Sequence, residues 1–201
     1  MRGLFVTGTD TGAGKSIVSA ALVAAMAADG ERVRAHKPVV TGLEDHESGG
    51  WPADHELLAA AARMRPEQVA PLRYDPAVSP HLAAELAGEE ISPAAVIAAA
   101  RGDLAPGARA NDSEQALIVE GVGGLLVPIT KDFSVCDLAA ALALPLLLAA
   151  RPGLGTINHT LLTLRVARAA GLEVRAVVLT PWRDRPSAIE RSNRDTVARL
   201  G

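Results

Sequence analysis

The stretch Gly8-Thr9-Asp10-Thr11-Gly12-Ala13-Gly14-Lys15-Ser16 decides the fold of this chain. An apolar run at residues 4–6 leads into it, and an Ala- and Val-rich stretch at residues 17–28 follows it. The order is therefore strand, glycine-rich loop and helix, in which backbone N–H groups and the helix N-terminus together attract phosphate. Lys15 can reach the outer phosphates of a nucleotide, and the Ser16 hydroxyl can bind Mg²⁺. The stretch predicts a site for a nucleoside triphosphate.

The spacing of this loop departs from the common phosphate-loop pattern of glycine, four residues and Gly-Lys-Ser or Gly-Lys-Thr. Five residues separate Gly8 from Gly14, and Thr9 stands where the pattern has glycine. A glycine-rich turn before an ordinary helix is the alternative interpretation. The order of strand, Gly14-Lys15-Ser16 and helix favours the phosphate loop.

Length and composition limit the classes of protein to consider. The 201 residues predict one domain, residues 1–201, and its core must be built from Ala, Leu and Val because aromatic residues make up only 2%. A net charge of −3 gives no indication of a nucleic-acid surface. The longest apolar stretch, residues 138–150, contains Pro145 and is too short to cross a membrane. A single cysteine, Cys136, excludes an internal disulfide and is typical of the cytoplasm.

The rest of the chain alternates between strand and helix patterns. Strands are expected at about residues 2–8, 32–39, 116–120, 144–150 and 174–180. Helices are expected at about residues 14–29, 54–64, 80–87, 93–101, 134–143, 156–170 and from 186 to the end. Loops are expected at 42–52, 66–80 and 102–113. Repeated strand–helix units predict an α/β fold with a mostly parallel sheet and helices on both faces.

Polar residues that follow the strands are the candidates for chemistry, because ligands bind at the carboxyl ends of parallel strands. The second strand ends in His36-Lys37-Pro38, with Thr41 just beyond, and the third ends in Glu120. The fourth strand is followed by Arg151. The pattern predicts that a lysine and a carboxylate lie around the phosphate site.

Each of these residues has a functional and a structural interpretation. Glu120 follows four apolar residues, where a carboxylate needs a cation as its partner. In the functional interpretation that cation is Mg²⁺, held together with Ser16; in the structural interpretation it is Lys37 or Lys15. Lys37 either acts on the γ-phosphate electrostatically or is a solvated lysine at a strand end. Asp54 either binds the metal or caps the helix that it begins.

The ordered motifs of the chain resemble those of the dethiobiotin synthetases, a branch of the P-loop family that includes the partition and septum-site ATPases. The phosphate loop resembles that family's signature, displaced first glycine included. Residues 37–42 (Lys-Pro-Val-Val-Thr-Gly) and 79–81 (Ser-Pro-His) resemble its Lys-Pro-Val segment and the start of its substrate-side helix. Residues 119–124 (Val-Glu-Gly-Val-Gly-Gly) resemble its Glu-Gly-Ala-Gly-Gly segment, and residues 155–160 resemble its dimer-contact segment.

The resemblance implies a ligase that converts 7,8-diaminopelargonic acid, CO₂ (or bicarbonate) and ATP to dethiobiotin, ADP and phosphate, with Mg²⁺. One substrate amine adds to CO₂ to form a carbamate, the carbamate is phosphorylated, and the second amine closes the ureido ring. A positive charge at Lys37 favours the neutral amine and the anionic carbamate, and with Lys15 and Mg²⁺ it stabilises phosphoryl transfer. The implied active site lies at the interface of a homodimer.

The resemblance also assigns roles to the residues that match its motifs. Lys37 and Lys15 are implied to be catalytic. The implied nucleotide-binding residues are Thr11, Gly12, Ala13, Gly14, Lys15, Ser16 and Thr180. The implied metal ligands are Ser16, Asp54 and Glu120. The implied substrate-binding residues are Thr41, Gly123, Gly124, Thr156, Ile157 and Asn158, of which the last three take the substrate carboxylate from the second subunit.

Two features differ from the family. Thr180 stands where the family often has an Asn that reads the base, and the chain stops at Gly201 where family members usually continue, so adenine and other bases are both open.

Three alternatives to a dethiobiotin synthetase are open. A partition-type regulatory ATPase would carry another lysine early in the loop, and residues 9–13 contain none. A related amide-forming ligase would need a glutaminase domain. A nucleotide-binding protein without turnover is the third alternative.

Overall fold

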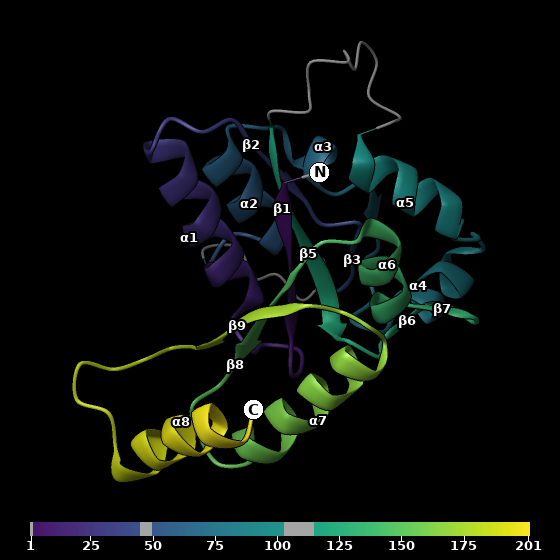
Figure 1. The fold of residues 1–201 in the computed structure, drawn as a ribbon. Coiled ribbons are helices and arrows are strands. Elements are labelled where there is room, and N and C mark those ends of the chain that lie inside the picture. The colour runs from purple at the N-terminus through teal and green to yellow at the C-terminus, as the bar shows by residue number, and fades with distance from the viewer. Residues whose placement is uncertain (1, 45–49, 103–114) are drawn as a thin grey trace.

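The computed structural model describes residues 2–44, 50–102 and 115–201, which build an α/β fold around one parallel sheet (Figure 1). The strand order in this five-stranded sheet is β2-β5-β1-β8-β9, and all neighbouring pairs are parallel. Its strands are β1 (Gly3–Gly8), β2 (Val33–His36), β5 (Ala116–Gly124), β8 (Leu146–Ala150) and β9 (Val174–Leu179). The predicted fold class is confirmed.

The helices follow the strands in the alternating order that the sequence predicts. They are α1 (Lys15–Ala28), α2 (Asp54–Ala62), α3 (Pro66–Val69), α4 (Pro80–Ala87), α5 (Pro93–Arg101), α6 (Val135–Leu142), α7 (Thr156–Ala169) and α8 (Ala188–Leu200). None of these helices in the described part of the chain is long and apolar enough to span a membrane.

Helices cover both faces of the sheet, because successive residues of a buried strand point to opposite sides. Val6 packs in one core with Val23 of α1 and Leu58 of α2. Its neighbour Phe5 packs in a second core with Leu138 of α6. Figure 1 shows α1 and α2 on one side of the central strands and α5 and α6 on the other. The apolar runs without alternation are therefore strands that are buried on both faces.

The structure corrects the sequence prediction in three segments. The predicted loop at residues 66–80 contains α3, which begins at Pro66, and β4 (Leu72–Arg73). The second strand ends at His36, because Pro38 has no N–H to donate; β3 (Val39–Val40) then pairs with β4 in a separate parallel ladder. The third strand runs on to Gly124, which pairs with Gly8 of β1.

One further difference is small, and part of two predicted loops cannot be compared. Residues 128–134 form a hairpin of β6 (Pro128–Thr130) and β7 (Phe133–Ser134), which the sequence analysis did not predict. Of the expected loops, residues 45–49 and 103–113 lie outside the described residues.

Candidate functional site

The phosphate loop is held at the carboxyl end of β1 by its neighbours in the sheet. The Thr9 N–H donates to the Ala149 carbonyl of β8 over 3.0 Å. Gly14 has φ +88°, and a Cβ there would lie 2.4 Å from the Thr180 Cγ2. Only glycine combines this left-handed conformation with so close an approach. The loop can therefore pass tightly over the end of the sheet before α1 begins at Lys15.

Two lysines and two carboxylates meet beside this loop, on elements far apart in the sequence. The Lys37 Nζ lies 2.8 Å from the Asp54 Oδ2 and 2.5 Å from the Glu120 Oε1. The same Glu120 oxygen accepts a hydrogen bond of 2.8 Å from the Ser16 hydroxyl. Lys15 Nζ donates to the Asp10 carbonyl over 3.2 Å. Lys37 and Glu120 are 3% and 0% exposed, so water solvates their charges hardly at all.

The electrostatics of this cluster follow from burial and pairing. Burial opposes the charge of Lys37, but Glu120 and then Asp54 outweigh it and raise the pKa of Lys37 above 10.5. Burial also opposes the charge of Asp54, yet the Lys37 ammonium lowers the pKa of Asp54 from 3.8 to about 2. Burial and the like charge of Lys37 lower the pKa of Lys15. All four side chains act on one another, and Lys37 is the fixed positive centre among them.

A cleft of about 880 Å³ opens over the loop and this cluster. Ten of the residues predicted for the site line it. They are Thr11, Gly12, Gly14, Lys15, Ser16, Lys37, Thr41, Asp54, Gly123 and Thr180. The rest of the wall is largely apolar and includes Ile17, Val78, Val122 and Val127. The cleft therefore offers both polar groups suited to phosphates and apolar side chains suited to a carbon chain.

The other predicted residues lie elsewhere. Ala13 and Glu120 are buried, at 1% and 0% exposed, behind the cleft wall. Gly124 lines a separate hollow with Leu126 and Leu162. The segment of residues 156–158, at the start of α7, does not line the cleft of its own chain. Its Thr156 side chain is buried and lies 3.3 Å from the Thr160 hydroxyl, Ile157 is partly buried, and Asn158 is exposed.

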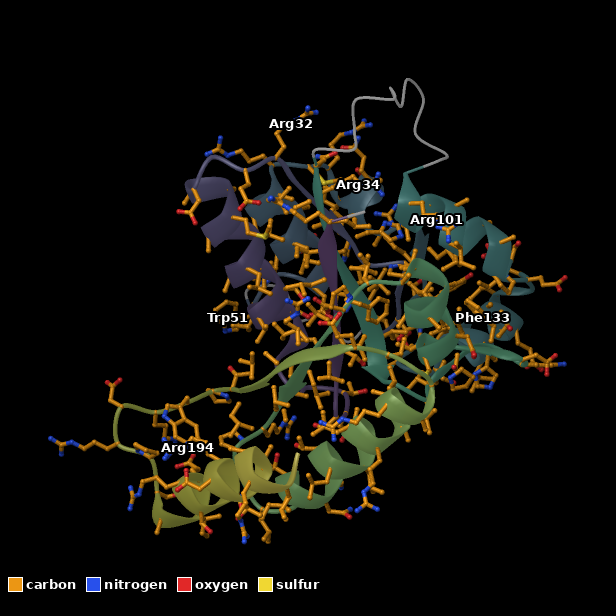
Figure 2. All side chains as sticks on the ribbon, viewed as in Figure 1. Arg32, Arg34, Trp51, Arg101, Phe133 and Arg194 are labelled. Carbon is orange, nitrogen blue, oxygen red and sulfur yellow. The ribbon has the colours of Figure 1, made fainter. Side chains whose placement is uncertain are left out.

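Two large side chains without a predicted role, Trp51 and Arg151, lie in the cleft wall and against the phosphate loop. Trp51 lines the cleft and is 73% exposed, and Figure 2 shows it beside the lower end of α1. Its position in a polar loop gave no signal. Arg151 donates from its Nε to the Gly12 carbonyl over 2.9 Å. The sequence marked it as a polar residue after a parallel strand but gave it no role in the site.

The arrangement of Ser16, Asp54 and Glu120 suits a magnesium ion. A hydroxyl and two carboxylates are hard oxygen ligands of the type that Mg²⁺ prefers. The second oxygen of Glu120, Oε2, is buried and has no hydrogen-bond partner among the described residues. A cation would satisfy that oxygen. The three residues are therefore the candidates for holding such an ion beside the phosphate loop.

Comparison with known proteins finds relatives over most of the chain. A family model described as AAA domain matches residues 2–201. The chain is 46% identical over 181 residues to an ATP-dependent dethiobiotin synthetase BioD from Anaeromyxobacter dehalogenans, covering 89% of this chain and 76% of that protein. It is 33% identical over 202 residues to the protein of the same name from Bacillus subtilis, covering 100% of this chain and 83% of that one.

Solved structures show the same fold at lower identity. The kinase domain of Escherichia coli tyrosine kinase ETK aligns with a TM-score of 0.50 and 19% identity, covering 93% of this chain and 70% of that chain. At this identity the likeness concerns the arrangement of the elements alone.

Proposed function

The chain belongs to the ATP-dependent dethiobiotin synthetase family, and from this premise we propose that its cleft converts 7,8-diaminopelargonic acid, CO₂ and ATP to dethiobiotin. The chain is accordingly an ATP-dependent ligase that forms C–N bonds. The observation that carries the proposal is the position of the Lys37 side chain. Its buried ammonium lies in the wall of the cleft that the phosphate loop lines, held by two carboxylates.

The proposed reaction forms and breaks bonds in three steps. One neutral amine of the substrate attacks CO₂, loses a proton and becomes a carbamate anion. A carbamate oxygen attacks the γ-phosphorus of ATP, and ADP leaves. The second amine then attacks the carbon of the phosphorylated carbamate, loses a proton to water and expels phosphate, which closes the ureido ring. No covalent bond to the protein is required, so the protein's contribution is position and charge.

Lys37 and Lys15 supply the positive charge. The Lys37 ammonium stays protonated at neutral pH because its carboxylate partners raise its pKa, so it favours the carbamate anion over the neutral amine and CO₂. Lys15, in the loop that wraps the phosphates, stabilises the charge on the transferred phosphoryl group. Thr41 and Gly123 line the same cleft and are our candidates for substrate contacts.

Mg²⁺ completes the proposal, with Ser16, Asp54 and Glu120 as its protein ligands. When bound, the ion would neutralise charge on the β- and γ-phosphates. The unpartnered buried oxygen of Glu120 supports this assignment.

We also propose that a second copy of the chain completes the substrate site. Residues 156–158 match the family's dimer-contact segment yet lie outside the cleft of their own chain. The backbone N–H groups at the start of α7 are suited to a carboxylate. A homodimer would bring them to the partner's cleft.

We further propose a cytoplasmic location, as the sequence indicated. The free thiol of Cys136 is consistent with a reducing compartment.

The test is an assay with diaminopelargonic acid, bicarbonate, Mg²⁺ and each nucleoside triphosphate in turn, with dethiobiotin measured by mass spectrometry. Lys37→Ala is expected to lose about 10²-fold or more of the rate, as for one electrostatic catalytic group, while it still binds ATP. Lys131→Ala, which removes a charge from an exposed lysine, is the matched control.

Two outcomes would count against the proposal. Product formed by Lys37→Ala at the control rate would remove the lysine from the chemistry. ATP hydrolysis that needs no diamine, with no dethiobiotin from any triphosphate, would favour the regulatory ATPase.

A further inference from the structure

Arg151 connects the sheet to the phosphate loop through a single hydrogen bond. It directly follows β8, and its Nε donates to the Gly12 carbonyl over 2.9 Å. The guanidinium lies against Gly12: a Cβ on that residue would be 2.5 Å from the Arg151 Nη2. Among the described residues, no carboxylate forms an ion pair with this guanidinium. Its polar partner among the described residues is therefore the Gly12 carbonyl of the loop.

The bond fixes the direction of one peptide group in the loop. Because a trans peptide unit is planar, the Gly12 carbonyl and the Ala13 N–H point in opposite directions. With the carbonyl turned toward Arg151, the Ala13 N–H points away from it. Gly12, at φ +72°, belongs to the residue type that can reverse a peptide group at least cost. A reversed group would direct a carbonyl oxygen where the loop must offer N–H groups to phosphate.

The segment that carries Arg151 is itself fixed by α8. The buried side chain of Asn193 donates from its Nδ2 to the Pro152 and Gly153 carbonyls, each over 2.9 Å. These two bonds hold the chain directly after Arg151. The last helix is thereby connected to the phosphate loop, although it does not line the cleft.

We propose that Arg151 is a positioning residue for nucleotide binding, which locks the Gly12–Ala13 peptide in the orientation that binds phosphate, with Asn193 fixing its segment. The inference rests on the proposed function only in that the loop binds the nucleotide. The loss of Arg151 should therefore weaken nucleotide binding without affecting how the diamine binds.

The test measures ATP affinity directly by titration calorimetry, on the full chain, and then KM for ATP and for the diamine separately. Arg151→Met, which keeps the length of the side chain and removes its donors, should raise the Kd for ATP about tenfold, the effect of one hydrogen bond from a charged group. Arg151→Lys, which keeps the charge and places an ammonium donor group on the side chain, should restore most of that affinity. Asn193→Ala should weaken ATP binding in the same direction. Arg199→Met removes an exposed charge from α8 and is the control.

Affinity for ATP that is unchanged in Arg151→Met would overturn the proposal. So would equal weakening in the Met and Lys variants, because the donated hydrogen bond would then be irrelevant. A rise in the KM of the diamine equal to that of ATP would indicate general damage to the cleft and would also overturn it. Because ATP binding is measured without turnover, a lack of dethiobiotin formation would refute the proposed function and leave this result standing.

Discussion

The buried pair of Lys37 and Glu120 should show strong energetic coupling in a double-mutant cycle. Their charged atoms lie 2.5 Å apart, and at an effective dielectric of about 20 this corresponds to about 7 kcal/mol of attraction before desolvation. Desolvation of both groups offsets most of it, and Asp54 keeps a share of the lysine. We therefore expect a net coupling of about 2–3 kcal/mol.

Each single variant should be strongly destabilising, and their costs should not add in the double variant. Lys37→Met leaves Glu120 buried with only the Ser16 hydroxyl, and Glu120→Gln leaves the ammonium with Asp54 alone. Each should cost about 3–5 kcal/mol, because one buried charge loses its compensation. The double variant should cost less than the sum of the two single variants, because it removes both charges of the pair and leaves neither of them buried without its partner.

Urea unfolding at pH 7, followed by circular dichroism in the absence of nucleotide, measures all four members of the cycle. Glu85→Gln, which neutralises an exposed carboxylate on α4, is the matched control and should change stability by less than about 0.5 kcal/mol. The reasoning is refuted if the costs of the two single variants simply add, or if either single variant is as stable as the control.

Three further predictions concern the same cleft. Asp54→Asn should lower the free energy of unfolding by about 1 kcal/mol at pH 7, a value reduced for the 49% exposure of this side chain. Because the pKa of Asp54 is about 2 in the folded protein against an ordinary 3.8, the difference from wild type should be full above pH 3.8 and should shrink as the pH falls through 2, as unfolding curves across that range would measure. Gly14→Ala should destabilise the protein by about 1–3 kcal/mol and abolish ATP binding, because φ is +88° and a neighbouring methyl carbon lies 2.4 Å from the new Cβ; wild-type calorimetric affinity in this variant would contradict it. In a Trp182→Phe background Trp51 is the only tryptophan, and its emission should change on ATP binding because it lines the cleft; an unchanged spectrum at saturating ATP would show that it does not sense the ligand.

Local pattern was sufficient to predict the five strands of the main sheet and seven of the eight helices in the described residues. The glycine loop between an apolar run and an Ala-rich stretch specified β1 and α1, and α4 and α5 begin at Pro80 and Pro93 as predicted, since proline favours the first turn of a helix. The pattern failed at Pro66, where four prolines in fifteen residues suggested a loop and the structure has α3 and β4. There, pairing with β3 stabilises a strand too short to be recognised from the sequence.

The order of motifs along the chain is enough to place a lysine, a carboxylate and a phosphate loop at one edge of a parallel sheet, because that edge is where all the strands end. The motifs do not reveal that Lys37 bonds both Asp54 and Glu120, that Gly124 lines a different hollow, or that Arg151 bonds Gly12, all of which depend on how the folded chain packs. Strand and helix formation depends on neighbours a few residues away, whereas these hydrogen bonds join groups 17 to 139 positions apart and are set by how the layers pack.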